Sequence, residues 1–158
     1  MLCARGKGAQ ARNELSNSSF VRKPDPVGSW PFVFLEPQFA GITFHRVIEE
    51  PDAGDIVLQL RPNLEIGDGV HDVGAKCVQA AKFAGAELCK FFLTNGSFSY
   101  SKQPSSGRLW RINDFHPSHL RIIYNLFDDD IVDAYLSGQL SNRQPTLINT
   151  VSLPEKSF

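Results

Sequence analysis

A single carboxylate stands out between two strand-like runs of the sequence. Asp52 lies in the turn Glu49-Glu50-Pro51-Asp52-Ala53-Gly54, where proline restricts φ and glycine permits a positive φ. A carboxylate that two strands hold in place is suited to take a proton from an attacking amine, provided that a nearby donor stabilises the oxyanion. The other interpretation is an ordinary turn aspartate that accepts hydrogen bonds from nearby backbone amides. Residue type and spacing leave both interpretations open.

Two histidines lie near this turn in the sequence. His45 precedes it on a β-branched run, and a neutral imidazole at that place is able to act as a base. A histidine on such a strand more often packs or forms a local hydrogen bond, and we expect that of His45. His71 falls in the first turn of a helical pattern, and we expect it at the surface.

The elements that must position these groups follow from the apolar pattern. Residues Gly41–Ile48 and Asp55–Arg61 are β-branched and roughly alternating, which predicts two strands joined by a six-residue loop. From Val70 to Phe92 apolar residues recur at three- and four-residue steps, which predicts an amphipathic helix. Asp68 is the predicted N-cap, and Asn95-Gly96 is the predicted end of this helix.

The remaining segments are read more coarsely. Residues 30–35 predict a short helix or a buried segment, and residues 97–107 are typical of a loop. A second helical pattern runs from about Ser118 to Ser137 and is interrupted by Asp128-Asp129-Asp130, which could cap a separate short helix. Residues 146–151 form a β-like run.

Composition limits the function classes. The chain has 158 residues, about one domain, and 16 Lys+Arg against 17 Asp+Glu give a net charge of −1. This near-neutral charge argues against binding a nucleic-acid polymer or an anionic lipid surface. The three cysteines fit no disulfide or metal pattern, and the longest apolar run is too short to span a membrane. With no secretory signal evident, we expect a cytoplasmic protein with buried thiols.

Two stretches together resemble a known family. The strand Gly41-Ile42-Thr43-Phe44-His45 followed by Asp52-Ala53-Gly54-Asp55-Ile56 resembles the signature of the formyltransferases that use 10-formyltetrahydrofolate as formyl donor. The glycine-led Gly28-Ser29-Trp30-Pro31-Phe32 resembles the segment that precedes this strand, so the match covers residues 28 to about 92. The resemblance implies an α/β fold, the C-terminal part of a Rossmann-like core. It also implies that Asp52 is catalytic and that the backbone of Glu49, Glu50 and Pro51 borders the pterin ring.

One part of the family pattern is not found. The family has an Asn-x-His pair upstream of the aspartate, which corresponds to residues 13–19 here. Asn13 or Asn17 could match the asparagine, but no histidine precedes His45. The later Asn113-Asp114-Phe115-His116-Pro117-Ser118 has the wrong spacing and order, and we interpret it as a helix entry capped by Asp114 or Ser118. We therefore expect a formyltransferase lacking its N-terminal part, truncated or altered at its start.

A weaker resemblance concerns the acceptor. Tyr100-Ser101-Lys102, Gly107-Arg108-Leu109-Trp110-Arg111 and Asp128-Asp129-Asp130-Ile131-Val132 are similar to the tail of sugar N-formyltransferases, whose acceptors are typically dTDP-4-amino-4,6-dideoxyhexoses. On this view Trp110 or Tyr100 stacks on the base, and Arg108 or Arg111 meets the diphosphate. The alternative is a Trp110 in the core and two solvated arginines.

These expectations divide the chain into three parts. Residues 1–27 are a poorly ordered or altered lead-in, residues 28–95 belong to the formyltransferase core, and residues 96–158 form a substrate and dimerisation extension. The resemblance suggests a homodimer in which residues 146–151 pair across the interface. Two rival hypotheses remain: a catalytically inactive binding module that lacks the Asn-x-His pair, and an unrelated small α/β domain.

Overall fold

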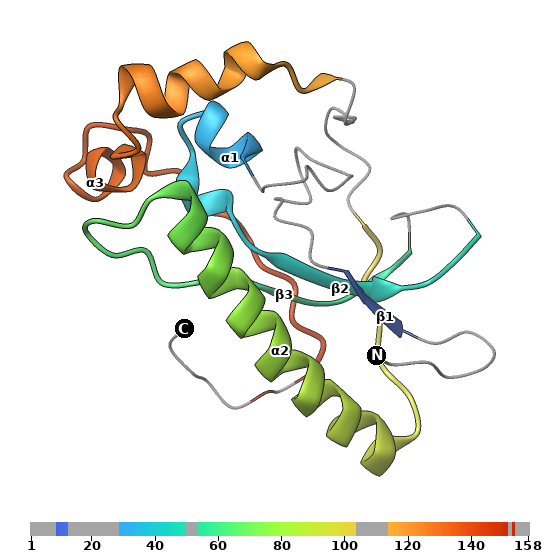
Figure 1. Cartoon of the computed structure of the whole chain (residues 1–158). Helices are drawn as coiled ribbons and strands as arrows, with labels where there is room; N and C mark the ends of the chain where they lie inside the picture. The colour runs from blue at the N-terminus through green and yellow to red at the C-terminus, as the bar shows by residue number, and fades with distance from the viewer. Residues whose placement is uncertain (1–8, 13–28, 50–53, 104–113, 152, 154–158) are drawn as a thin grey trace.

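A computed structural model gives the fold of this protein (Figure 1). It describes residues 9–12, 29–49, 54–103, 114–151 and 153, and the description below is confined to them. A three-stranded sheet carries one long helix, α2, across a face, and the shorter helical segments gather near the N-terminal end of α2 (Figure 1). The fold is therefore a small mixed α/β arrangement, as the sequence predicts at that coarse level.

The sheet is antiparallel throughout. Its order is β1 (Ala9–Arg12), β2 (Ile42–Arg46) and β3 (Ile56–Leu60), with Ala11 opposite Phe44 and Phe44 opposite Leu58. The predicted pair of strands is confirmed as the hairpin β2–β3. A parallel, Rossmann-like sheet is not present among the described elements.

Strand β1 lies within the predicted lead-in. The sequence predicts residues 1–27 as a poorly ordered or altered lead-in, and within them Ala9–Arg12 pair with β2 as an edge strand. The segment Ala-Gln-Ala-Arg has no strong β propensity, and its pairing rests on backbone hydrogen bonds to a neighbouring strand. Sequence patterns report side chains, so they give no signal for such an edge strand.

The outer edge of β3 is paired by two segments that follow α2. Ile56 and Ser101 exchange backbone hydrogen bonds of 2.7 and 2.8 Å, and further along the strand Gln59 N donates to Ile148 O at 2.7 Å. Thr150 N donates to Val57 O at 3.0 Å. The predicted β-like run at residues 146–151 thus pairs within its own chain, with the strand that forms the centre of the core.

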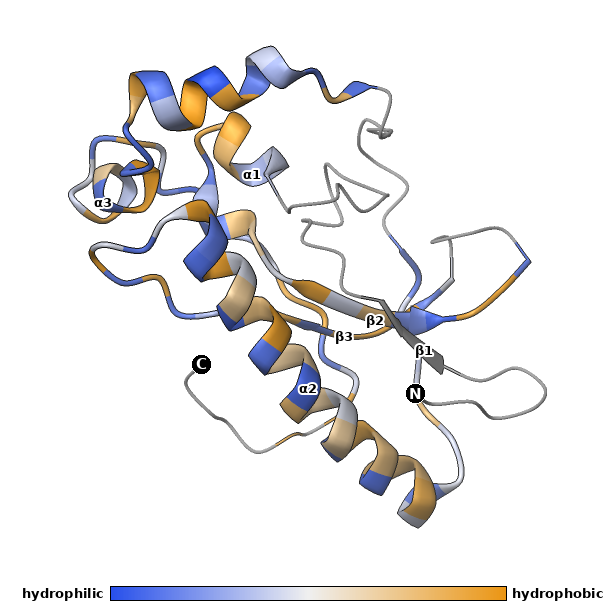
Figure 2. Ribbon diagram, in the orientation of Figure 1, coloured by the Kyte–Doolittle hydropathy of each residue, from blue (hydrophilic) through white to orange (hydrophobic). Residues whose placement is uncertain are grey.

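Helix α2 (Val70–Asn95) covers the sheet and confirms the predicted amphipathic helix. Apolar and polar bands alternate along it (Figure 2). Its buried positions pack on the inner side chains of β2 and β3, forming one core with members Ile42, Phe44, Val57, Leu58, Cys77, Ala80, Ala84, Leu88, Phe98 and Val151. Gly96 ends the helix with a left-handed φ of 75°, as predicted. No helix in the described part of the chain is long and apolar enough to cross a membrane.

A second core lies where the short helical segments meet the start of α2. The short helical segments are α1 (Trp30–Val33), η1 (Pro37–Phe39), η3 (Pro117–His119), η4 (Ile122–Leu126) and α3 (Ile131–Leu136). Trp30 is 1% exposed and is flanked by the rings of Phe34 and Phe115, with centroids 5.6 and 5.3 Å away. The sequence leaves residues 30–35 open to two interpretations, a short helix or a buried segment. Residues 30–33 are helical and buried, and residues 34 and 35 are partly buried.

The helix entry predicted near Asp114 is present, with a different cap. His116 caps η3 by accepting a hydrogen bond from Ser118 N at its Nδ1, at 3.2 Å. Neither Asp114 nor Ser118 is the N-cap, because η3 begins at Pro117, directly after His116. Asn113 lies outside the described residues.

The N-terminus of α2 is held by carboxylates from the second core. Val70 N donates to Asp129 Oδ1 at 3.0 Å, and Gly67 N donates to Asp133 Oδ1 at 2.7 Å. The predicted N-cap Asp68 is wrong: the cap position is Gly69, and the Asp68 carboxylate instead accepts from Glu65 N and binds Lys76. These carboxylates neutralise the positive end of the helix dipole and join the two cores.

We expect Asp129→Ala to lower the free energy of unfolding by about 1–2 kcal/mol, because it leaves the Val70 amide without its acceptor. The matched control is Asp128→Ala, since Asp128 and Asp129 both have a positive φ, of 53° and 64°, and share the same backbone strain. Urea unfolding followed by circular dichroism measures both. Equal losses in the two variants would show that the carboxylate does not cap α2.

The different burial of Cys77 and Cys89 allows a second prediction. Burial raises the pKa of Cys77 to about 12, from a usual value of 9.0. Because the pKa of Cys77 is higher in the folded than in the unfolded state, the contribution of its thiol to stability is complete below about pH 9 and is lost as the pH rises from 9 towards 12.

At pH 8 we expect iodoacetamide to label the partly exposed Cys89 and to spare Cys77 until urea unfolds the chain. Peptide mass mapping tests this; equal labelling rates without urea would contradict it.

Candidate active site

Two glycines bracket the hairpin β2–β3 because each backbone approaches the opposite strand closely. A Cβ on Gly41 would lie 2.5 Å from Leu60 O, and a Cβ on Gly54 would lie 1.6 Å from Arg46 O. Both are glycines of the formyltransferase-like signature. The geometry therefore supplies a local reason for glycine at each position, and the two glycines fix where the paired strands begin and end.

The loop end of the hairpin is closed by backbone contacts. Arg46 N donates to Asp55 O at 2.9 Å, and the side-chain amide of Gln103 donates to Gly54 O at 2.7 Å. Gln103 lies two residues after Ser101, and Ser101 pairs with Ile56 of β3. The described ends of β2 and β3 are thus held together by each other and by the chain that returns after α2.

That returning chain brings Tyr100 to the loop end. The Arg46 guanidinium carbon lies 5.6 Å from the centroid of the Tyr100 ring, a cation–π arrangement. Tyr100 is 36% exposed, so part of its ring is open to a ligand. Sequence analysis did not select Arg46, because nothing in a single sequence signals that a residue of β2 meets one that follows α2.

His45 is buried and forms a local hydrogen bond, as expected. It is 4% exposed, and its Nδ1 lies 3.2 Å from Arg46 O, so Nδ1 carries the proton that this carbonyl accepts. The register shifts between Phe44 and His45, the mark of a β-bulge. The extra residue is Val57 of β3, because Phe44 pairs with Leu58 and His45 with Ile56.

The threonine of the signature belongs to a buried polar network. Gln59 donates to Thr43 Oγ1 at 3.3 Å, and its carbonyl accepts from Ile148 N at 3.1 Å. Thr43 is 7% exposed and Gln59 is 5% exposed. Because both polar groups of Gln59 are used, the network fixes the hairpin and the returning tail in one register.

Several of the predicted site residues lie outside the described part of the chain. These are Glu50, Pro51, Asp52, Arg108, Trp110 and Arg111. Of the others, Glu49 is exposed beside Val47 and Ile48, whose side chains are 42% and 39% exposed. His71 is also at the surface, as expected, and lies 3.1 Å from the Tyr124 hydroxyl. Two predicted residues are thereby placed near one end of β2: Glu49 follows this strand in the chain, and Tyr100 contacts its last residue, Arg46.

The described site offers a cation, an aromatic face and two exposed aliphatic side chains at the mouth of one loop. Within the described residues, no group of three His, Cys, Asp or Glu side chains is arranged to hold a metal ion. No protein-family model matches the sequence, and no curated protein matches it.

Proposed function

We propose that this protein transfers a formyl group from 10-formyltetrahydrofolate to the amino group of a nucleotide-linked amino sugar of the dTDP type. The observation that carries the proposal is the hairpin β2–β3, whose two signature glycines are each required by a close backbone approach. In this proposal the hairpin belongs to the C-terminal part of a Rossmann-like formyltransferase core. The signature aspartate, Asp52, belongs to the loop between these strands.

The proposed step needs few groups from the protein. The amine nitrogen of the sugar attacks the formyl carbon, and an oxyanion forms at the formyl oxygen. The bond from that carbon to N10 of the folate then breaks, and the new amide remains on the sugar. Asp52 takes the proton that the attacking amine loses, and N10 of tetrahydrofolate gains a proton as it leaves.

The loop end has surfaces suited to both ligands. Exposed Val47 and Ile48 offer an apolar border to a flat pterin ring. The proposal assigns the backbone of Glu49, Glu50 and Pro51 to the same border by the resemblance alone. On the other side, Tyr100 offers an aromatic face for the thymine base, and Arg46 adds a cation for the diphosphate.

Further residues and an assembly complete the proposal. Trp110, Arg108 and Arg111 contribute to the nucleotide site, and the C-terminal extension forms a homodimer. A cytoplasmic location is part of the same proposal. Light scattering tests the assembly, since a monomeric mass would contradict the dimer.

Binding measured by isothermal titration separates the candidate functions. The proposal predicts that tetrahydrofolate and a dTDP-amino sugar each bind saturably, and that Tyr100→Ala weakens the nucleotide sugar only, by about tenfold. Tyr124→Ala is the matched control, since Tyr124 is similarly exposed, at 38%, but belongs to η4. Failure of both ligands to bind would contradict the proposal.

A second candidate is a binding module without chemistry. The sequence has no histidine before His45, so the upstream Asn-x-His pair of the resembled family is not found in it. A module that retains the nucleotide site would bind the dTDP sugar but form no formylated product. Sugar binding without folate binding would favour this alternative.

A further inference from the structure

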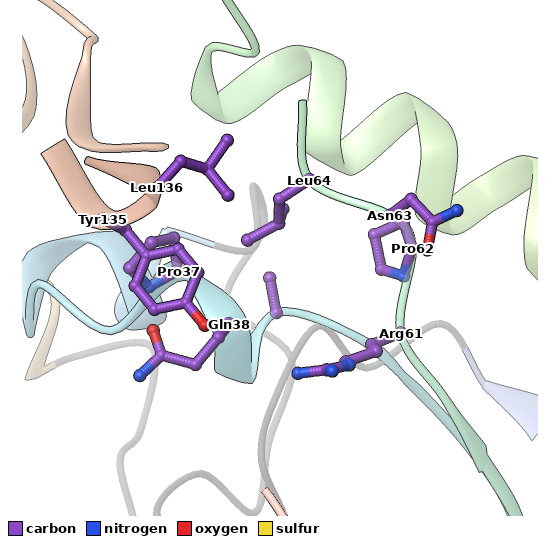
Figure 3. Close-up of a pocket in the computed structure, with 9 residues that line it drawn as sticks. Pro37, Gln38, Arg61, Pro62, Asn63, Leu64, Tyr135 and Leu136 are labelled. Carbon is purple, nitrogen blue, oxygen red and sulfur yellow. The ribbon is translucent and has the colours of Figure 1, made fainter. Parts of the chain in front are cut away.

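A cavity of about 190 Å³ opens beside the end of β3 that is remote from the loop. It lies between η1, the segment after β3 and α3, and Figure 3 shows side chains from all three turned around it. Its lining is Pro37, Gln38, Ala40, Arg61, Pro62, Asn63, Leu64, Tyr135 and Leu136. At about 30 Å³ per water, it has room for a molecule of a few heavy atoms.

Two hydrogen-bond donors converge on this cavity. Figure 3 shows the Arg61 guanidinium and the Tyr135 hydroxyl directed toward one another from opposite sides. Gln144 joins them: Arg61 Nη1 donates to Gln144 Oε1 at 2.9 Å, and Gln144 Nε2 donates to Tyr135 Oη at 2.9 Å. Because the Tyr135 oxygen accepts this bond, its own proton is available to donate to a ligand.

The residues that line the cavity carry positive charge and no negative charge. Arg61 is its only ionised side chain, and none of the nine lining residues is acidic. In the part of the chain that the structure describes, Arg61 forms no ion pair, and its remaining N–H groups are suited to a carboxylate. Proline and leucine side chains supply the rest of the wall and favour a hydrocarbon portion.

The segment that carries Gln144 is held in place by hydrogen bonds to the buried Gln38. Gln38 is 1% exposed, and its side-chain amide donates to Ser141 O at 3.2 Å and to Arg143 O at 2.9 Å. Arg143 also binds Glu36 at 2.9 Å. These contacts fix the segment that carries Gln144, so the bridge between Arg61 and Tyr135 is positioned before any ligand arrives.

We propose that this cavity binds a small monocarboxylate with a short hydrocarbon tail. One carboxylate oxygen accepts from Arg61 and the other from Tyr135, while the tail contacts the leucine and proline wall. The single positive charge matches a monovalent anion better than a phosphate dianion. The site lies at the far end of β3, roughly 16 Å from the loop by strand length, and does not depend on formyl transfer.

Amide chemical shifts in a titration of the full chain with butyrate test the site. We expect saturable shifts at Arg61, Asn63 and Leu64 and at residues 135–136, with an affinity of about millimolar because Arg61 is exposed and screened. Butyramide, which has the same shape without the charge, is the ligand control, and inorganic phosphate is the ionic control. Equal effects from butyrate and butyramide, or tighter binding of phosphate, would overturn the proposal.

Two variants divide the site into its parts. Arg61→Gln is expected to weaken butyrate binding about tenfold or more, because it removes the positive charge that pairs with the carboxylate. Tyr135→Phe removes one neutral donor and is expected to weaken binding by a smaller factor. Arg121→Gln removes an exposed arginine elsewhere and should leave the affinity unchanged. Unchanged binding in both Arg61→Gln and Tyr135→Phe would overturn the assignment, and the amide spectra report whether each variant remains folded.

Discussion

Replacement of Gly54 by alanine is expected to break the loop end of the hairpin and to lower the free energy of unfolding by about 3 kcal/mol or more. The added Cβ would lie 1.6 Å from Arg46 O and 2.7 Å from the carbonyl carbon of the same residue. Both are backbone atoms of β2, so no side-chain rotation relieves the clash. The strands must separate there, and the backbone hydrogen bond from Arg46 N to Asp55 O is lost with them.

The matched control is Gly74→Ala in helix α2, where the added Cβ would meet nothing within 4 Å beyond its chain neighbours and the adjoining helix backbone. Alanine has the higher helix propensity, so this substitution should raise the free energy of unfolding by about 0.5–1 kcal/mol. Urea unfolding of the two variants gives changes of opposite sign. A small loss for Gly54→Ala would mean that the close approach to Arg46 does not exist.

Asp52→Asn is expected to lower the rate of formyl transfer by about 10²–10⁴-fold while leaving the binding of both ligands nearly unchanged. Asparagine keeps the size of the side chain and removes the carboxylate that, in the proposed mechanism, takes the proton from the attacking amine. The loss therefore falls on the turnover number rather than on the dissociation constants. Steady-state assays of tetrahydrofolate release, together with titrations, measure the two effects separately.

Asp55→Asn is the control for a general loss of negative charge near the loop. The backbone of Asp55 closes the hairpin through Arg46, and an asparagine there retains that backbone bond. Its turnover should stay close to that of the unaltered protein. Equal losses from Asp52→Asn and Asp55→Asn would contradict a specific catalytic role for Asp52.

The sequence was informative where structure depends on neighbouring residues. Helix α2 follows from the three- and four-residue spacing of apolar residues, and its end follows from Gly96. The hairpin follows from two alternating runs separated by a Pro- and Gly-containing turn. In these elements the periodicity of the side chains and the buried face agree, so a local pattern is sufficient.

The features that the sequence did not predict depend on contacts between distant segments. Asp129 replaces Asp68 as the carboxylate at the start of α2 because the second core folds against that helix. Arg46 meets Tyr100 only because the chain after α2 returns to the edge of β3. A single sequence contains no periodic signal for such pairings, and the same limit applies to the bridge formed by Gln144.

The measurement that bears most directly on the proposed function is the mass spectrum of a dTDP-4-amino-4,6-dideoxyhexose after incubation with 10-formyltetrahydrofolate and this protein. The proposal predicts a sugar heavier by the mass of one CO unit, formed in proportion to tetrahydrofolate released. The N-acetylated sugar, which has no free amine, should remain unchanged. An unmodified amino sugar after incubation with protein that binds both ligands would contradict formyl transfer by this protein.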